Sequence, residues 1–174
     1  MKRRPLLLSG LMLAAGLAVF LGWPAPEPVR AATVGDVALV RVEKASRRLS
    51  LLDEAGGVVR SYSGVQLGDE PSGPKQFEGD ERTPEGRYVI DYGNEASAYF
   101  LSLHISYPAA ADRSFAAGQG RSPGGDIFIH GQPNALPAGR MPGDWTDGCI
   151  ALSNAEMEEV WALVPDGTPI EIVP

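Results

Sequence analysis

The sequence predicts a single, mainly β domain that is rich in turns and carries two short helices. Several short segments alternate apolar and polar residues with the two-residue period of a half-buried strand. Glycine and proline, 21 and 15 of the 174 residues, are spread between these segments, which is typical of a chain with many turns. About 140 residues follow the N-terminal segment, enough for one core and too few for two comfortable ones.

Seven segments are expected to form strands. They are residues 37–42, 48–53, 58–62, 87–92, 99–107, 126–130 and 168–173. Gly56-Gly57 predicts a turn between the second and third. Thr83-Pro84-Glu85-Gly86 predicts a turn before the fourth. Residues 68–82 combine glycines, prolines and charges, so we expect a long exposed loop there, and loops of that length are often functional.

Two helices are expected, one over residues 108–117 and one that begins after Ser153. Pro108 suits the first turn of the former, and Gly118 suits its end. Ser153 and Glu156 form a capping box, in which each side chain bonds a free backbone N–H of the first turn. The apolar positions that follow at helical spacing are Met157, Val160, Trp161 and Val164.

The first 31 residues are typical of a signal peptide. A basic start, Lys2-Arg3-Arg4, precedes an uncharged apolar run over residues 6–23, and Ala31 suits a cleavage site. The alternative is an uncleaved anchor, because the run is almost long enough to span a bilayer. Both interpretations predict an exported protein, in the periplasm or cell envelope, whose folded domain spans residues 32–174.

The charge balance is acidic. The chain has 15 basic and 22 acidic side chains and a formal net charge of −7. Since the predicted signal segment holds four of the basic residues and one acidic one, the remainder is more acidic still. Such a surface argues against nucleic acid and against an anionic membrane as partners.

Cys149 is the only cysteine, so an exported chain of this sequence cannot close a disulfide within itself. One alternative is a buried, inert thiol. The preceding Gly148 favours a nucleophile instead, because it lets a substrate carbonyl approach the backbone. Backbone N–H groups of Gly148 and Cys149 could then face an oxyanion. The helix start at Ser153 is expected to lower the pKa of the thiol.

Two histidines could serve as the base. His130 ends a predicted strand and is followed by Gly131 and a loop rich in proline and glycine, the usual setting of a site. His104 lies within a strand, on the face opposite Leu103 and Ile105, and is interpreted as structural or as a support for the site.

Other chemistries find little support. His104, His130 and Cys149 lack the close spacing of a zinc site, so no metal is expected. No Gly-x-Ser-x-Gly elbow, phosphate-binding loop or dinucleotide motif is present, and no cofactor is expected. Carboxylates are plentiful, but nothing singles out a catalytic pair.

Two motifs together resemble the L,D-transpeptidase catalytic domain (YkuD-type) of bacterial cell-wall enzymes. They are Ile129-His130-Gly131 and Thr146-Asp147-Gly148-Cys149-Ile150. The similarity extends to the turn at 83–86 and covers most of residues 36–174. The Trp145 before the second motif is most similar to the small YafK-like Gram-negative branch. The resemblance implies a β-sandwich with the cysteine on a loop before the C-terminal helix.

The resemblance also implies the chemistry. Cys149 would attack the carbonyl of an L-configured centre in a peptidoglycan stem peptide and form a thioester, with D-alanine leaving. His130 would move the proton, the Gly131 carbonyl would orient its ring, and Gly148 and Cys149 would supply oxyanion donors. Further candidates for contact with substrate or support of the pair are Trp145, Thr146, Asp147, His104 and Arg140.

Ala151 departs from the family, in which many members have arginine two residues after the cysteine. This absence leaves the acyl acceptor open, although Arg140, Arg121 or Arg82 could substitute. An amine of a second stem or of a wall-attached protein would give transfer. Water would give an L,D-carboxypeptidase or amidase that trims stems or releases wall-attached protein. A wall-binding module without activity is the third alternative.

Overall fold

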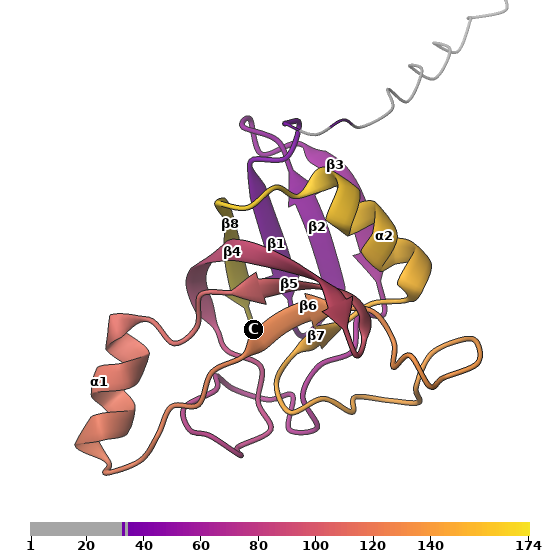
Figure 1. Ribbon diagram of the computed structural model, residues 1–174. Coiled ribbons are helices and arrows are strands. Elements are labelled where there is room, and N and C mark those ends of the chain that lie inside the picture. Colours follow the sequence, from indigo (N-terminus) through magenta and orange to yellow (C-terminus); the bar gives the residue numbers. More distant parts are fainter. Residues whose placement is uncertain (1–32, 34) are drawn as a thin grey trace, which may run out of the picture. The chain divides into compact units, whose positions relative to one another are not determined.

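The computed structural model describes residue 33 and residues 35–174, so the predicted signal segment lies outside the described residues. Eight strands and two helices make up this part of the chain (Figure 1). The strands are β1 (Leu39–Glu43), β2 (Arg48–Leu52), β3 (Val58–Ser63), β4 (Gly86–Ser97), β5 (Phe100–Ile105), β6 (Ile127–His130), β7 (Ile150–Ala151) and β8 (Thr168–Val173). The helices are α1 (Ala110–Gly118) and α2 (Asn154–Leu163). The mainly β prediction with two helices is therefore confirmed.

The strands join in the order β3-β2-β1-β8-β4-β5-β6-β7. Strand β4 connects the two halves because it is long enough to pair twice: Gly86–Ile90 with β8, and Ile90–Ser97 with β5. At β4 the sheet changes direction, and β4, β5 and β6 cross in front of β1 and β8 (Figure 1). The sandwich thus consists of one continuous sheet that folds over itself.

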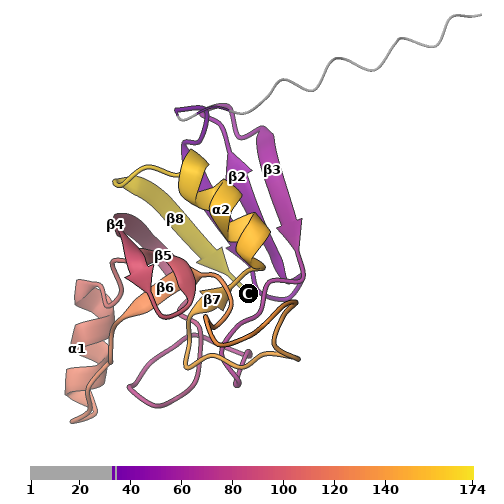
Figure 2. The same cartoon turned by 45° about the vertical axis from the view of Figure 1, so that its right-hand side comes forward.

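The core lies between the folded halves and beneath α2. Alternation along β1 and β2 buries Val40, Val42, Leu49 and Leu51, as the sequence pattern predicts. Helix α2, which lies over one face of the sheet (Figure 2), adds its own buried apolar residues, Met157, Val160 and Leu163.

The predicted capping box starts α2. The Ser153 hydroxyl accepts a hydrogen bond from the Glu156 N–H (3.4 Å), and the Glu156 carboxylate accepts one from the Ser153 N–H (2.9 Å). Helix α1 begins two residues later than expected, and its first turn is capped by Asp112, which accepts the Ala109 N–H at 2.8 Å.

Two features of the sheet differ from the prediction. Strand β4 runs on to Ser97, through a polar stretch without apolar alternation, because it pairs with β5. Strand β7 was not predicted, since two residues are too short to show a period. The long loop after Gly68 is confirmed as irregular backbone.

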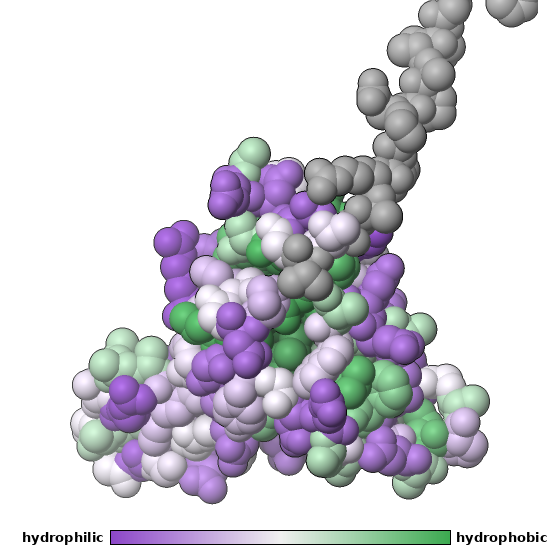
Figure 3. Space-filling view, turned by 45° about the horizontal axis from the view of Figure 1, so that its top comes forward, coloured by the Kyte–Doolittle hydropathy of each residue, from purple (hydrophilic) through white to green (hydrophobic). Residues whose placement is uncertain are grey.

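The face shown in Figure 3 mixes hydrophilic and hydrophobic residues. Within the described part of the chain, no helix is long and apolar enough to cross a membrane.

Candidate active site

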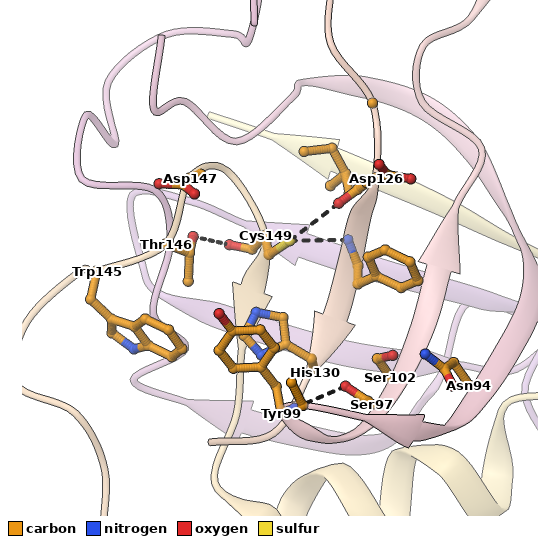
Figure 4. Close-up of a pocket in the computed structure, with 14 residues that line it drawn as sticks. Asn94, Ser97, Tyr99, Ser102, Asp126, His130, Trp145, Thr146, Asp147 and Cys149 are labelled. Carbon is orange, nitrogen blue, oxygen red and sulfur yellow. Dashed lines mark hydrogen bonds between the residues drawn. The ribbon is translucent and has the colours of Figure 1, made fainter. Parts of the chain in front are cut away.

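Strands β6 and β7 bring the two catalytic candidates to one face of the sheet. They pair in parallel, Ile129 with Ile150 and His130 with Ala151. Both isoleucines are fully buried in the core. Because side chains alternate along a strand, His130 on β6 and Cys149, directly before β7, both project from the opposite face (Figure 4).

A cavity of about 510 Å³ opens over this face. Its walls come from the β4–β5 hairpin, from β6 with the residues before it, and from the segment that ends at the cysteine. The lining residues are Asn94, Ser97, Ala98, Tyr99, Ser102, Gly125, Asp126, Ile127, Phe128, His130, Trp145, Thr146, Asp147 and Cys149. The cavity is therefore lined by five of the residues that the sequence singled out: His130, Trp145, Thr146, Asp147 and Cys149.

The Cys149 thiol is held by backbone groups of the β6 segment. Its Sγ accepts the Phe128 N–H at 3.4 Å and lies 3.6 Å from the Asp126 carbonyl, to which the S–H donates (Figure 4). Burial raises the pKa of Cys149 from 9.0 to about 11, with a smaller contribution from the Asp147 charge, against a lowering by the Phe128 N–H. The thiol is therefore neutral at rest, and the expectation of a lowered pKa is wrong because burial dominates.

His130 is 3% exposed and packs against aromatic rings. Its Nδ1 donates to the Gly131 carbonyl at 2.6 Å, which leaves the Nε2 lone pair as the base. Burial lowers the pKa of His130, so the ring is neutral near pH 7. The rings of Tyr99 and Trp145 lie 4.8 and 5.6 Å from that of His130, centroid to centroid.

No hydrogen bond joins His130 to the thiol in the described structure, because the S–H is directed at the Asp126 carbonyl. Asp126 itself has a positive φ of 54°, a conformation that is uncommon outside glycine. The backbone at this residue therefore sets the resting direction of the thiol.

The turn before Cys149 is built around Thr146. The Thr146 hydroxyl donates to the Cys149 carbonyl at 2.7 Å and accepts the Gly148 N–H at 3.2 Å. Gly148 has a φ of 128°, and a Cβ there would lie 2.5 Å from the Arg82 carbonyl oxygen. The position thus requires glycine for two reasons, its dihedral angle and the close backbone approach.

Gly131 is also tightly enclosed. A Cβ at this position would lie 2.7 Å from Asn154 Oδ1 and 2.9 Å from Phe100 Cβ. Its N–H donates to the Tyr99 carbonyl at 3.0 Å. The carbonyl that orients the His130 ring is therefore fixed by its neighbours on both sides.

Two supports of the site become visible only in the structure. In the first, the loop that begins at Gly68 packs against the cysteine turn. The approach is so close that a Cβ added to Gly68 would lie 3.2 Å from the Gly148 Cα. In the second, Gln132 Nε2 donates to Gln66 Oε1 (3.1 Å) and to the Leu152 carbonyl (2.7 Å). Glutamines are usually exposed, and no local pattern indicates that these two are buried together.

Other predicted residues lie away from the thiol. His104 Nδ1 bonds Asp91 at 2.6 Å, and its ring stacks on Tyr92, 4.5 Å between centroids. Its ring also meets the edge of Phe128, whose N–H bonds the thiol, so His104 contacts a support of the site.

The arginines that could replace a family arginine do not line the cavity. Arg140 bonds the Gly64 carbonyl and Glu156, and Arg121 lies over the Phe77 ring. Ala151 is fully buried opposite His130 and exchanges backbone hydrogen bonds with Gln66.

Among the described residues, no group of three or more histidine, cysteine or acidic side chains could hold a metal ion.

Comparison with known proteins identifies the family to which this chain belongs. Residues 38–172 match the model of the L,D-transpeptidase catalytic domain, YkuD, and the chain belongs to this family. Among curated relatives it is similar to YafK of Escherichia coli (strain K12), with 24% identity over 145 residues, which cover 81% of this chain and 52% of YafK. The chain thus spans about half the length of the curated relatives it matches.

Solved structures agree with the fold. The helical cell shape determining protein Pgp2 from Campylobacter jejuni has a TM-score of 0.63 and 27% identity, covering 83% of this chain and 52% of Pgp2. An L,D-transpeptidase from Xylanimonas cellulosilytica has a TM-score of 0.52 and 16% identity, covering 83% of this chain and 62% of that one. The fold is therefore that of an L,D-transpeptidase domain.

Proposed function

We propose that this protein is a cysteine-dependent acyltransferase that acts on peptidoglycan stem peptides through a thioester at Cys149. L,D-transpeptidases act on such peptides. The observation that carries the proposal for this chain is the placement of Cys149 and His130 on one face of adjacent strands, lining one cavity. We further propose that the domain works outside the cytoplasm, as its N-terminal residues suggest.

The first half-reaction starts with Cys149 and His130 both uncharged. As Cys149 Sγ turns from the Asp126 carbonyl to attack the donor carbonyl carbon, His130 Nε2 accepts the thiol proton. Proton transfer within the step avoids the cost of a free thiolate, whose pKa of about 11 makes it rare near neutrality. The Gly131 carbonyl keeps Nδ1 protonated and so stabilises the imidazolium that forms.

The tetrahedral oxyanion needs a donor. The Gly148 N–H already donates to Thr146, so the Cys149 N–H is the more available of the two proposed groups. When the intermediate collapses, the carbon–nitrogen bond breaks and the imidazolium gives its proton to the leaving amine. A thioester remains, with the His130 ring neutral again.

In the second half-reaction His130 takes a proton from the acceptor, whose amine or water attacks the thioester carbonyl. The Cys149 sulfur leaves and recovers the proton. An amine acceptor gives transfer, and water gives hydrolysis. The family membership favours transfer, to a second stem or to a wall-attached protein.

Muropeptide analysis with the full-length protein tests this function. We expect the wild-type protein to form new linked products from tetrapeptide stems and to gain a carbapenem adduct by intact mass, and Cys149→Ala to do neither. His130→Gln should keep the thiol but slow acylation by at least about 100-fold. A wild-type protein that gains no adduct and leaves muropeptides unchanged would contradict the enzyme proposal, whereas shortened stems alone would assign water as the acceptor.

A further inference from the structure

The exposed ring of Tyr99 lies over the buried ring of the catalytic histidine (Figure 4). Its centroid is 4.8 Å from that of His130 and 5.8 Å from that of the Trp145 ring, so the three rings form one cluster in the wall of the cavity. Tyr99 is 41% exposed, whereas His130 is 3% exposed. The tyrosine therefore stands between the catalytic base and bulk water.

The turn that carries Tyr99 is held by Asn134. This turn joins β4 to β5, and Asn134 lies in the loop after β6. Three hydrogen bonds connect them: Asn134 Oδ1 accepts the Phe100 N–H at 2.8 Å, its Nδ2 donates to the Ser97 carbonyl at 2.9 Å, and its own N–H donates to the Ala98 carbonyl at 2.9 Å. One asparagine thus binds the turn on both sides of Tyr99.

Two further features show that the turn is fixed by its surroundings. Phe100 has a positive φ of 68°, a conformation that is strained for an aromatic residue and persists only where neighbours hold it. The Tyr99 carbonyl accepts the Gly131 N–H at 3.0 Å, next to the carbonyl that orients the His130 ring. The Tyr99 ring is therefore positioned from β6 and from the loop that follows it.

The acyl-enzyme is the state in which this cover matters. Its thioester is hydrolysed when a water oxygen bonds the acyl carbon, His130 takes a proton from the water, and the Cys149 sulfur leaves and recovers that proton. Once the acyl group fills the cavity, the remaining side of His130 is the one beneath Tyr99 and Trp145. A single water molecule has too few contacts to replace those of a held ring, whereas a peptide acceptor brings contacts of its own.

We propose that the Tyr99 ring, held by Asn134, excludes water from the thioester and so selects an amine-bearing peptide as the acyl acceptor. This inference rests on the proposed acyl transfer and chooses between its two acceptors. It makes Tyr99 a specificity-determining residue and Asn134 a positioning residue that acts through the turn. Neither side chain takes part in the proton transfers.

The lifetime of a carbapenem adduct tests the exclusion of water in the absence of any acceptor. The adduct is a thioester of Cys149, and its loss after removal of unbound carbapenem, followed by intact mass, measures hydrolysis alone. We expect hydrolysis to be about tenfold faster in Tyr99→Ala and several-fold faster in Asn134→Ala, because both changes uncover His130. Tyr99→Phe keeps the ring and should restore the wild-type lifetime.

The partition of products tests the selection of the acceptor. With a tetrapeptide donor and a fixed concentration of acceptor stem, the ratio of linked product to shortened stem should fall about tenfold in Tyr99→Ala. Phe115→Ala is a matched control, because it removes an aromatic ring of similar exposure (47%) from α1. Gln119→Ala, which removes an exposed amide after α1, is the control for Asn134→Ala. Both controls should keep the wild-type lifetime and ratio.

The outcomes separate this inference from the function on which it rests. Equal adduct lifetimes in the wild type and Tyr99→Ala, or a lower product ratio that comes from slower transfer with unchanged hydrolysis, would overturn the shielding and leave the thioester chemistry standing. Wild-type protein that yields only shortened stems would do the same. A wild-type lifetime in Asn134→Ala would refute the positioning role. No adduct in the wild type or in any variant would overturn both the acyl transfer and the shielding.

Discussion

At the catalytic pair, burial favours the neutral form of both partners. It raises the pKa of the Cys149 thiol and lowers that of the His130 imidazole. A thiolate–imidazolium pair is therefore disfavoured at rest, and the nucleophile forms only as the proton moves. The backbone carbonyls of Asp126 and Gly131 hold the two groups in these neutral states.

The pH dependence of thiol alkylation follows from the pKa of Cys149. Iodoacetamide reacts with the thiolate, whose population rises tenfold per pH unit below the pKa. With a pKa of about 11 in place of 9.0, the alkylation rate should still climb steeply between pH 9 and 10, where an ordinary thiol levels off. The rate is measured by intact mass, and the urea-unfolded protein is the control. A plateau near pH 9 in the folded protein would contradict the burial argument.

Gly148 fixes the turn that presents the thiol. Gly148→Ala should lower the free energy of unfolding by about 3 kcal/mol, because the new Cβ meets the Arg82 carbonyl oxygen and the φ of 128° is strained. Thermal unfolding measures this as a fall in Tm of about 10 °C. Gly118→Ala is the matched control, since nothing lies within 4 Å of its Cβ position and its φ is not positive. Equal Tm values for the two variants would show that the turn can relax.

Among the secondary-structure elements, β7 has only two residues, but its pairings on both sides position residues of the active site. Its parallel pairing with β6 fixes Ala151 opposite His130, and its other neighbour, Gln66, holds it from the far side. The Gln66 and Gln132 side chains then anchor the loop after β6: Gln66 Nε2 donates to the Met141 carbonyl at 2.6 Å, and Gln132 Oε1 accepts the Met141 N–H at 2.8 Å.

Removing one glutamine should loosen that loop. Gln132 is 1% exposed, and Gln132→Ala leaves the Leu152 carbonyl and the Met141 N–H without their partner. We expect a loss of about 2–3 kcal/mol and faster amide hydrogen exchange over residues 134–144. Gln119→Ala, at an exposed site after α1, should change neither. Unchanged exchange in Gln132→Ala would mean that the loop is held by other contacts.

At the scale of the molecule, the long loop between β3 and β4 connects the first strands to the site. Lys44, at the end of β1 and 2% exposed, donates to the carbonyls of Gly73 (2.6 Å) and Thr83 (3.0 Å) and to Glu85 (2.8 Å). The same loop packs under the cysteine turn through Gly68. Lys44 thus links the sheet to the support of the nucleophile.

Lys44→Met should release this loop. The substitution leaves a half-buried Glu85 carboxylate and two carbonyls unpaired, at a cost of about 3 kcal/mol. We expect trypsin to cut faster after Lys75 and Arg82, which both lie in the loop, as followed by mass spectrometry. Arg48→Met removes an exposed pair with Glu43 at 3.6 Å and should cost less than about 0.5 kcal/mol. Equal cleavage of the two variants would refute the link.

Much of the fold could be predicted because its signals are local. The alternation in β1, β2, β6 and β8 reflects burial on one face, and the Ser153 capping box needs residues only three apart. The second half of β4 and all of β7 could not be predicted, since their pairing partners, not their own residues, make them strands.

By itself, the sequence determined the fold class, the family motifs and the identity of the thiol. Strand periodicity, helix capping and motif spacing all depend on residues that lie close together in the chain. Only the tertiary structure decided the state of that thiol and what surrounds it. The burial that raises the Cys149 pKa and the backbone groups of Asp126 and Phe128 that bond its sulfur depend on segments far apart in the chain. Electrostatics and hydrogen bonding act through distances in space, and these exist only once the sheet has folded at β4.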